Sequence, residues 1–251
     1  MDYAKLLDLV TEIGEGMLEN GAEIYRVEES LQRMLEAYGI QEVESFAVQT
    51  AIIVTIVTPQ TGPVTRLRRI RSRGTNLDMV DQLNGLSRKI CASRPSLETI
   101  RGWVDQANAR KPYPFPVQVL AYSLVAFSFA LLFGGTGQDA LCAAAVGALL
   151  KIVCASVERF PVNGFFVNLL GGAVTAAFSL AAVRLGLAIQ MDKVVISVLM
   201  NMVPGVAITN SMRDIMAGDL MAGQTKLTEA LFAAVAMAAG SGMALSLAIW
   251  L

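Results

Sequence analysis

The residues best suited to binding chemistry gather in one segment, which reads NMVPGVAITNSMRD from Asn201 to Asp214. Pro204 removes one backbone hydrogen bond from a helix, and Gly205 beside it adds backbone freedom. A helix broken within a membrane exposes carbonyl oxygens and amide groups, which many transporters use to hold a small polar substrate. We therefore predict a substrate-binding site here, made of Asn201, Pro204, Gly205, Thr209 and Asn210.

An α-amino acid offers a carboxylate and an ammonium group to such a site. Amide groups at the helix restart beyond Pro204 and Gly205, together with Asn201, would suit the carboxylate. Carbonyl oxygens freed just before the break would suit the ammonium group. The alternative interpretation is a proline kink that binds no ligand.

A transport cycle also needs a group that binds a proton or a cation. The chain has no histidine, which leaves carboxylates for this role. We expect Arg213, Asp214 and Glu229 to act in coupling or gating at the cytoplasmic end of the transport path. A salt bridge between Lys226 and Glu229 would explain the presence of Glu229 equally well.

Lys151 and Glu158 complete the predicted coupling or gating set. They lie seven positions apart in an otherwise apolar stretch, on one face of a helix. For a dicarboxylate substrate, Lys151 would be the residue of interest. Two alternatives remain open, namely that Lys151 reaches toward the membrane surface or that it pairs with Glu158.

Several other kinds of site have no support in the sequence. The three cysteines, Cys91, Cys142 and Cys154, have no metal-binding spacing, and we predict neither a metal nor another cofactor. The net charge of −1 gives no argument for nucleic-acid binding. The acidic, amphipathic N-terminus does not resemble a secretory signal peptide.

The charge distribution divides the chain into two parts. Residues 1–116 carry 29 of the charged side chains and residues 117–251 carry 12, while the mean hydropathy of the chain is +0.53. The first part therefore has the composition of a soluble domain and the second that of a membrane domain. We expect a cytoplasmic α/β domain over residues 1–111, a proline-rich joint at 112–116 and a transmembrane domain at 117–251.

Apolar periodicity and turn residues predict the order α-α-β-β-α-α for the first domain. The expected elements are helices at 2–17, 24–38, 77–92 and 96–108, strands at 46–59 and 64–71, and a turn at 59–63. Alternation along the second strand places Arg69, Arg71 and Arg73 on one face. That face is either solvated or in contact with anionic lipid headgroups or a partner subunit.

Long uncharged stretches in the second part each reach the ~20 residues that a bilayer-crossing helix needs. They predict a helical bundle of five transmembrane helices, at about 117–134, 140–158, 164–184, 193–211 and 228–250. Basic residues concentrate on the side of the N-terminal domain, including Arg110, Lys111 and Arg159. The positive-inside rule then places the N-terminal domain in the cytoplasm and the C-terminus outside.

Three sequence blocks resemble the threonine/serine exporter family (ThrE-like). They are GAEIYRVEESLQRML at Gly21–Leu35, TRLRRIRSRGTNLDMVDQLNGLSRKI at Thr65–Ile90, and NMVPGVAITNSMRDIMAGDLMAGQTKLTEAL at Asn201–Leu231. The resemblance implies export of small amino acids, or of small carboxylates in some short members, driven by an ion gradient. It also implies a multi-pass protein in the cytoplasmic (inner) membrane of a bacterium.

The resemblance further implies a partner. Long members of the family continue into a second membrane half, whereas this sequence resembles the short form that works with a separately encoded small membrane subunit. We therefore expect a hetero-oligomer that contacts a small-molecule substrate, the lipid bilayer and that second subunit.

The alternative function is a membrane-anchored cytosolic enzyme or sensor. An anchor needs one span rather than five, and residues 1–116 contain no recognisable set of catalytic residues. We therefore expect a subunit of a secondary transporter and not an enzyme.

Overall fold

The computed structural model describes residues 1–58, 62–110 and 112–249. The chain divides into two compact units. The first unit combines Met1–Lys111 with Gly205–Thr228, and the second combines Pro112–Pro204 with Glu229–Leu251. A segment expected to belong wholly to the membrane domain is therefore packed with the N-terminal elements.

The first unit begins with two helices, continues with three strands and returns to helices. The elements are α1 (Tyr3–Glu19), α2 (Ile24–Ala37), β1 (Glu42–Val48), β2 (Ala51–Thr58), β3 (Gly62–Arg69), α3 (Leu77–Ser93) and α4 (Leu97–Asn108), joined by α9 (Gly205–Ala217) and the start of α10 (Leu220–Ile249). The strands form one antiparallel sheet in the order β1-β2-β3.

The sheet has one more strand than the sequence predicts. The stretch expected to be a single strand at 46–59 supplies the end of β1 and all of β2, because a two-residue turn at Gln49 and Thr50 reverses the chain. The register pairs Val48 with Ala51 across this turn. Neither turn residue is Gly, Asn, Asp or Pro, so the usual signal was missing. Residues 59–61 of the expected turn at 59–63 lie outside the described residues.

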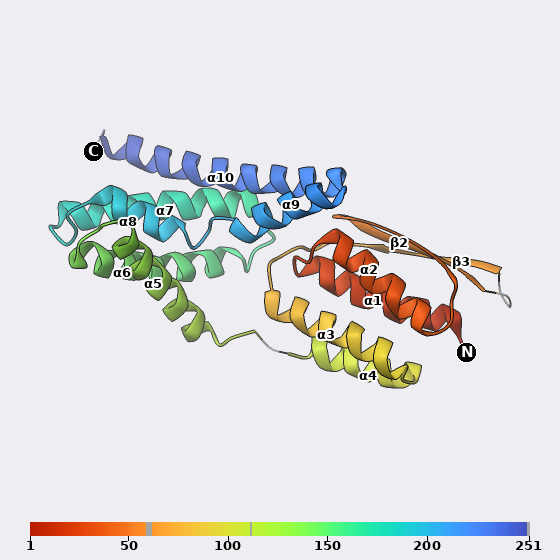
Figure 1. Ribbon diagram of the computed structural model, residues 1–251. Helices are drawn as coiled ribbons and strands as arrows, with labels where there is room; N and C mark the ends of the chain where they lie inside the picture. The colour runs from red at the N-terminus through yellow and green to blue at the C-terminus, as the bar shows by residue number, and fades with distance from the viewer. Residues whose placement is uncertain (59–61, 111, 250–251) are drawn as a thin grey trace. The chain divides into compact units, whose positions relative to one another are not determined.

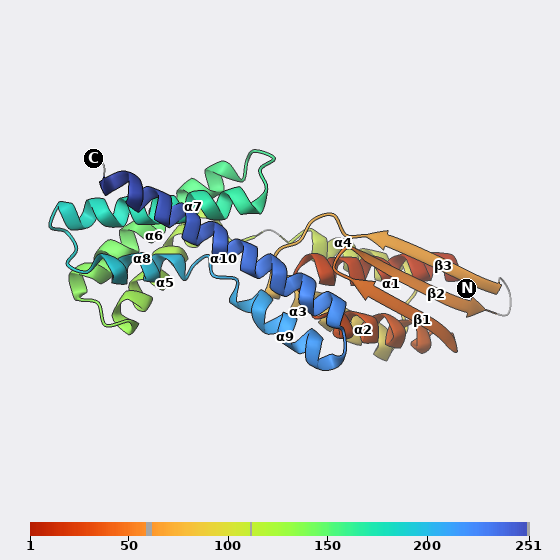
Figure 2. The ribbon, with the colours of Figure 1, turned by 90° about the horizontal axis from the view of Figure 1, so that it is seen from above.

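The first unit is built in layers, as Figures 1 and 2 show for its labelled elements. Helices α1 and α2 cover one face of the sheet, and α3 and α4 pack on the other side of these two helices. In β2, Ile52, Val54 and Ile56 alternate inward and are fully buried, which is the two-residue period of a half-buried strand. They join a core that includes Leu31 and Ile13.

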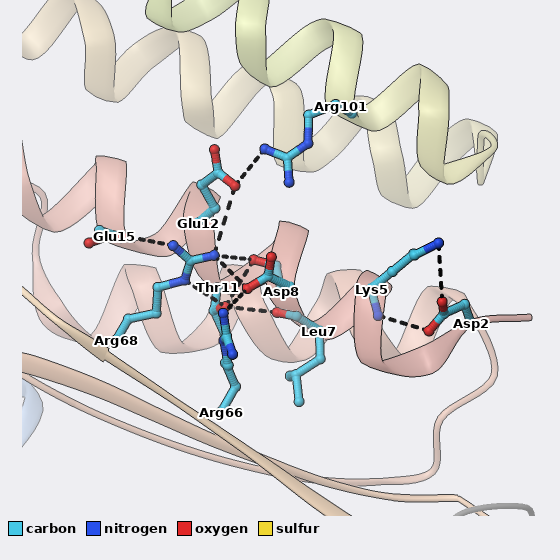
Figure 3. Close-up of polar contacts among 10 residues, drawn as sticks. All are labelled: Asp2, Lys5, Leu7, Asp8, Thr11, Glu12, Glu15, Arg66, Arg68 and Arg101. Carbon is cyan, nitrogen blue, oxygen red and sulfur yellow. Dashed lines mark hydrogen bonds and ion pairs between the residues drawn. The ribbon is translucent and has the colours of Figure 1, made fainter.

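Arginine side chains fasten the outer elements to α1 (Figure 3). Arg68 on β3 donates to the Asp8 carboxylate at 2.7 Å and to Glu15 at 2.9 Å. Arg101 on α4 donates to Glu12 at 2.7 Å. Arg68 therefore serves the fold rather than a solvated surface.

Arg66 also pairs with Asp8, whereas two of the arginines expected on one face of the second strand, Arg69 and Arg71, lie outside this network. Arg69 and Arg71 are exposed, and neither has a partner among the residues that the structure describes. Contact of this face with anionic lipid or a partner subunit remains a prediction.

The second unit is helical. It contains α5 (Phe115–Leu132), α6 (Gly137–Val157), α7 (Gly164–Arg184), α8 (Met191–Leu199) and the greater part of α10. Among the described residues, four helices are long and apolar enough to cross a membrane, namely α5, α6, α7 and α10. They overlap four of the five expected spans, and α10 begins eight residues before the expected start at 228.

The expected span at 193–211 is divided between two short helices. Helix α8 ends at Leu199 and α9 begins at Gly205. Between them the chain forms a turn, in which the Met202 amide donates to the Leu199 carbonyl at 2.8 Å. Pro204 has no amide hydrogen with which to continue the helix. The stretch therefore contains two helices separated by residues 200–204, and their role as one broken transmembrane helix stays a prediction.

Two glycines let α7 and α10 approach closely within the second unit. A Cβ atom built on Gly172 would overlap the carbonyl oxygen of Met237, and one built on Gly240 would overlap that of Leu169. The Ser241 hydroxyl donates to the Gly172 carbonyl at 3.1 Å. Small residues at such crossings bring backbones together where lipid supplies no hydrophobic driving force.

Replacing Gly240 by Ala should disrupt this crossing. The new methyl group would force the backbone of α10 away from α7, with an expected destabilisation of about 1–3 kcal/mol. Gly242→Ala is the matched control, because a Cβ at that position meets nothing within 4 Å. Thermal unfolding of both variants in detergent tests the idea, and equal melting temperatures for the two would contradict it.

Candidate functional site

The predicted site residues are divided between the two units. Lys151, Glu158, Asn201, Pro204 and Glu229 belong to the second unit, and Gly205, Thr209, Asn210, Arg213 and Asp214 belong to the first.

In the second unit, Asn201 and Lys151 both contact Tyr122 of α5. The Asn201 side-chain amide donates to the carbonyl oxygens of Tyr122 at 3.3 Å and of Val198 at 3.1 Å. Both partners are acceptors, so the amide nitrogen is occupied and Oδ1 has no partner among the described residues. Nζ of Lys151 lies 5.2 Å from the Tyr122 ring centre, a cation–π contact. No local sequence pattern singles out Tyr122.

Glu158 lies apart from this group. It caps the C-terminal end of α6 and is exposed, as is Glu229 on α10. In the described part of the chain, Lys151 forms no ion pair with Glu158. The structure thus brings together Lys151 and Asn201, through Tyr122, but not Lys151 and Glu158.

Asp139 is a buried carboxylate that the sequence analysis did not select. It forms a capping box with Thr136 at the start of α6. The capping box uses Oδ2 of Asp139, and Oδ1 accepts hydrogen bonds from the backbone amides of Ile189 at 2.7 Å and Gln190 at 2.9 Å. Asp139 therefore holds the segment that leads into α8. The spacing Thr136-x-x-Asp139 was the available signal, because it is a capping-box pattern.

In the first unit, Asp214 of α9 is fully buried against the start of α2. Its Oδ1 accepts the backbone amide of Ile24 at 3.1 Å, and its Oδ2 accepts Nζ of Lys226 at 2.8 Å. The carboxylate thus caps α2, where unpaired amides and the helix dipole favour a negative charge. The Lys226 side chain is itself only 8% exposed, so the two charges neutralise each other away from water.

Three further contacts bind α9 and α10 to the loop Gly21–Ile24, which we call the junction loop. Lys226 donates to the carbonyl of Ala22 at 3.1 Å, and the Asn210 amide donates to the carbonyl of Gly21 at 2.9 Å. Arg213 donates to Glu23 at 2.9 Å. These contacts use the carbonyl oxygens of Gly21 and Ala22 and the carboxylate of Glu23.

The second sequence block meets the junction loop from another direction. The amide of Gly74 donates to the carbonyl of Glu19 at 2.8 Å, and that of Asn76 donates to Asn20 at 3.0 Å. Gly21 has φ +95°, and a Cβ there would lie 3.1 Å from the Gly74 carbonyl oxygen. Only glycine suits both conditions. All three blocks that carried the family resemblance therefore converge on the junction loop.

Carboxylates near the junction loop have shifted pKa values. Burial raises the pKa of Glu28, opposed by the Ala47 amide and reinforced by the charge of Asp219. Burial and the charge of Asp214 raise the pKa of Asp219, and Lys226 opposes this. Burial also raises the pKa of Glu23, but hydrogen bonds and the charges of Arg213 and Arg26 outweigh it and leave the pKa lowered.

The remaining predicted residues do not join this cluster. Thr209 is exposed, and its hydroxyl donates to the carbonyl of Gly205 at 3.0 Å within α9. A Cβ built on Gly205 would meet nothing within 4 Å. Among the described residues, no group of three or more Cys, Asp or Glu side chains could hold a metal ion.

Four long apolar helices and a layered α/β unit define a multi-pass membrane protein. The chain belongs to the threonine/serine exporter family, because the family model described as "Putative threonine/serine exporter" (ThrE) matches residues 8–248. The family suggested by the three sequence blocks is thus confirmed.

Two curated relatives resemble the chain. It is 24% identical over 239 residues to the "Probable threonine/serine exporter" of Mycobacterium tuberculosis. This aligned region covers 94% of this chain and 45% of the relative. The chain is 23% identical over 252 residues to the "Threonine/serine exporter" of Corynebacterium glutamicum, covering 97% and 51%. The chain spans about half the length of the curated relatives it matches. No solved structure matches it.

Removing one member of the buried pair should destabilise the first unit strongly. Asp214→Asn leaves the Lys226 charge buried without its counter-charge, which costs about 3–5 kcal/mol in such pairs. Lys226→Met should have a similar cost, and the double variant should recover a large part of the loss. A double-mutant cycle on thermal unfolding measures this coupling. Additive losses in the double variant would show that the pair is not coupled.

Proposed function

We propose that this chain forms part of a secondary transporter that exports small amino acids such as threonine or serine, or small carboxylates. The proposal rests on the family match, which runs through both units and includes the residues between α8 and α9. Transport rather than catalysis is the activity that this membership supports.

We place the substrate path at the chain segment between α8 and α9. The amide nitrogen of Asn201 is already occupied, whereas its Oδ1 acceptor has no partner in the described ranges of the chain. This suits an ammonium or hydroxyl group better than the carboxylate that we first assigned to it. The amides that open α9, beginning at Gly205, remain suited to a carboxylate. Thr209 and Asn210 are then supporting residues of α9.

Coupling is assigned to the junction of α9 with α2. Asp214 holds Lys226 and the start of α2 at the same time, so protonation of its carboxyl would weaken both contacts. Arg213 would respond with it through Glu23. Glu229, Lys151 and Glu158 retain the gating roles proposed from the sequence.

The proposed topology has five crossings in the cytoplasmic membrane, the fourth over residues 193–211 and interrupted at Pro204. Reporter fusions after Gly137, Asn163, Met191, Gln224 and Leu251 should then alternate out, in, out, in, out. An inside signal at Leu251 would contradict this topology. The crossing to remove would then be the α8–α9 segment, because α6, which contains Lys151, is among the four long apolar helices.

We also propose that a second membrane component completes the transporter. The curated relatives are about twice as long as the matched region. In the second unit, α7 and α10 form an apolar groove of about 600 Å³ lined by Ala173, Ala177, Met243 and others. Small residues of this kind favour close contact with another helix. Full transport by this chain reconstituted alone would contradict the proposal.

Three substitutions test the substrate path in cells that contain both components. Pro204→Ala restores a backbone hydrogen bond, and Gly205→Leu fills open space beside it, so both should reduce export sharply while protein levels stay normal. Asn201→Ala should instead weaken apparent substrate affinity by about 1–2 kcal/mol, roughly the value of one hydrogen bond in a membrane.

Concentration-dependent threonine export, membrane protein levels and co-purification of the partner should be measured for each variant. A purely structural kink predicts the reverse pattern. In that case Pro204→Ala and Gly205→Leu would lower protein level or assembly, and Asn201→Ala would leave affinity unchanged.

A further inference from the structure

A groove lies between α2 and α3 in the first unit. It has a volume of about 800 Å³. Facing helices usually fill such a space with large apolar side chains, but here the lining includes Ser30, Ala37, Ser87, Cys91 and Ala92. Small side chains on both helices therefore leave the hollow open.

Three guanidinium groups surround this groove. Arg26 and Arg33 lie two turns apart on α2, and Arg88 lies opposite on α3. Arg88 is exposed and has no partner among the described residues. The lining acids are Glu29 and Glu36, and Glu29 already pairs with Arg33 at 2.5 Å. With three arginines against two glutamates, the lining carries one net positive charge, and Arg88 is the arginine left without an ion pair among the described residues.

We propose that this groove binds a soluble small molecule that carries phosphate groups. Arginine presents a planar set of donors that matches phosphate oxygens, and three such groups suit a ligand with more than one phosphate. The volume lies within the 300–1,000 Å³ range of small-molecule sites. Tyr25 and the Asn84 amide in the lining add an aromatic ring and neutral hydrogen-bonding groups of the kind that a nucleotide uses.

Occupancy of the groove would reach α9 through one chain of ion pairs. Nε of Arg26 lies 3.3 Å from Glu23, whose other oxygen accepts from Arg213 of α9 at 2.9 Å. A phosphate that binds Arg26 would break the contact of Arg26 with Glu23, and Glu23 would then keep only Arg213 in this chain of ion pairs. Binding would thus alter the contact between α2 and α9. This regulatory consequence rests on the proposed transport function, whereas the binding itself does not.

Cys91 supplies a direct readout of binding. Cys91 lines the groove, so a ligand bound there should slow the alkylation of its thiol. The full-length protein in detergent is treated with a maleimide, with and without ATP or inorganic pyrophosphate. Modification is then read by peptide mass spectrometry. Cys142 of the second unit is the internal control in the same sample.

Saturable protection of Cys91, but not of Cys142, is the expected result. Arg88→Gln should raise the ligand concentration needed for protection about tenfold, the value of one charge-assisted hydrogen bond. Arg71→Gln is the matched control, since Arg71 is exposed, has no partner in the described part of the chain and lies outside the groove.

Three results would overturn the proposal. The first is no protection of Cys91 by either phosphate probe, and the second is equal loss of protection in Arg88→Gln and Arg71→Gln. The third is protection by vesicles of anionic lipid without protection by ATP or pyrophosphate, which would assign the arginines to a membrane surface. Because none of these measurements requires transport, a failed export assay would not be confused with a failed binding site.

Discussion

The arrangement of the first unit depends on one buried carboxylate. Asp214 has no contact with solvent, so its charge must be balanced inside the protein. It is balanced by Lys226, twelve residues later, and by the first amide of α2, which lies 190 residues earlier in the chain. These contacts bind α9 and the first turns of α10 to the N-terminal elements. The rest of α10 continues into the second unit.

This constraint explains how charged residues can follow an apolar segment without facing lipid. Lys226, which the sequence suggested as a salt-bridge partner of Glu229, is buried and donates to Asp214 and to the Ala22 carbonyl of the junction loop. The interruption at Pro204 coincides with the boundary between the units, since Pro204 belongs to the second and Gly205 to the first. The same proline therefore ends one helical segment and separates the apolar bundle from a helix with polar, buried contacts.

Much of this organisation could be predicted from the sequence, because uncharged runs and apolar periodicity are local signals. They located the long apolar helices and the helices of the first unit. The β1–β2 turn was missed because Gln49 and Thr50 are not typical turn residues. The contact between Asp214 and Ile24 was missed for a different reason. It joins residues 190 positions apart, and no local pattern encodes such a pairing. Asp214 was selected, but its partner was not.

Asp214 holds α9 against the start of α2. Hydrogen exchange of the peptide covering the junction loop and the first turn of α2 tests this directly, because the Ile24 amide donates to Asp214. Exchange should be slow in the wild-type protein and much faster in Asp214→Asn, with a larger increase at this peptide than at the amides of β2. Unchanged exchange at Ile24 in that variant would contradict the account.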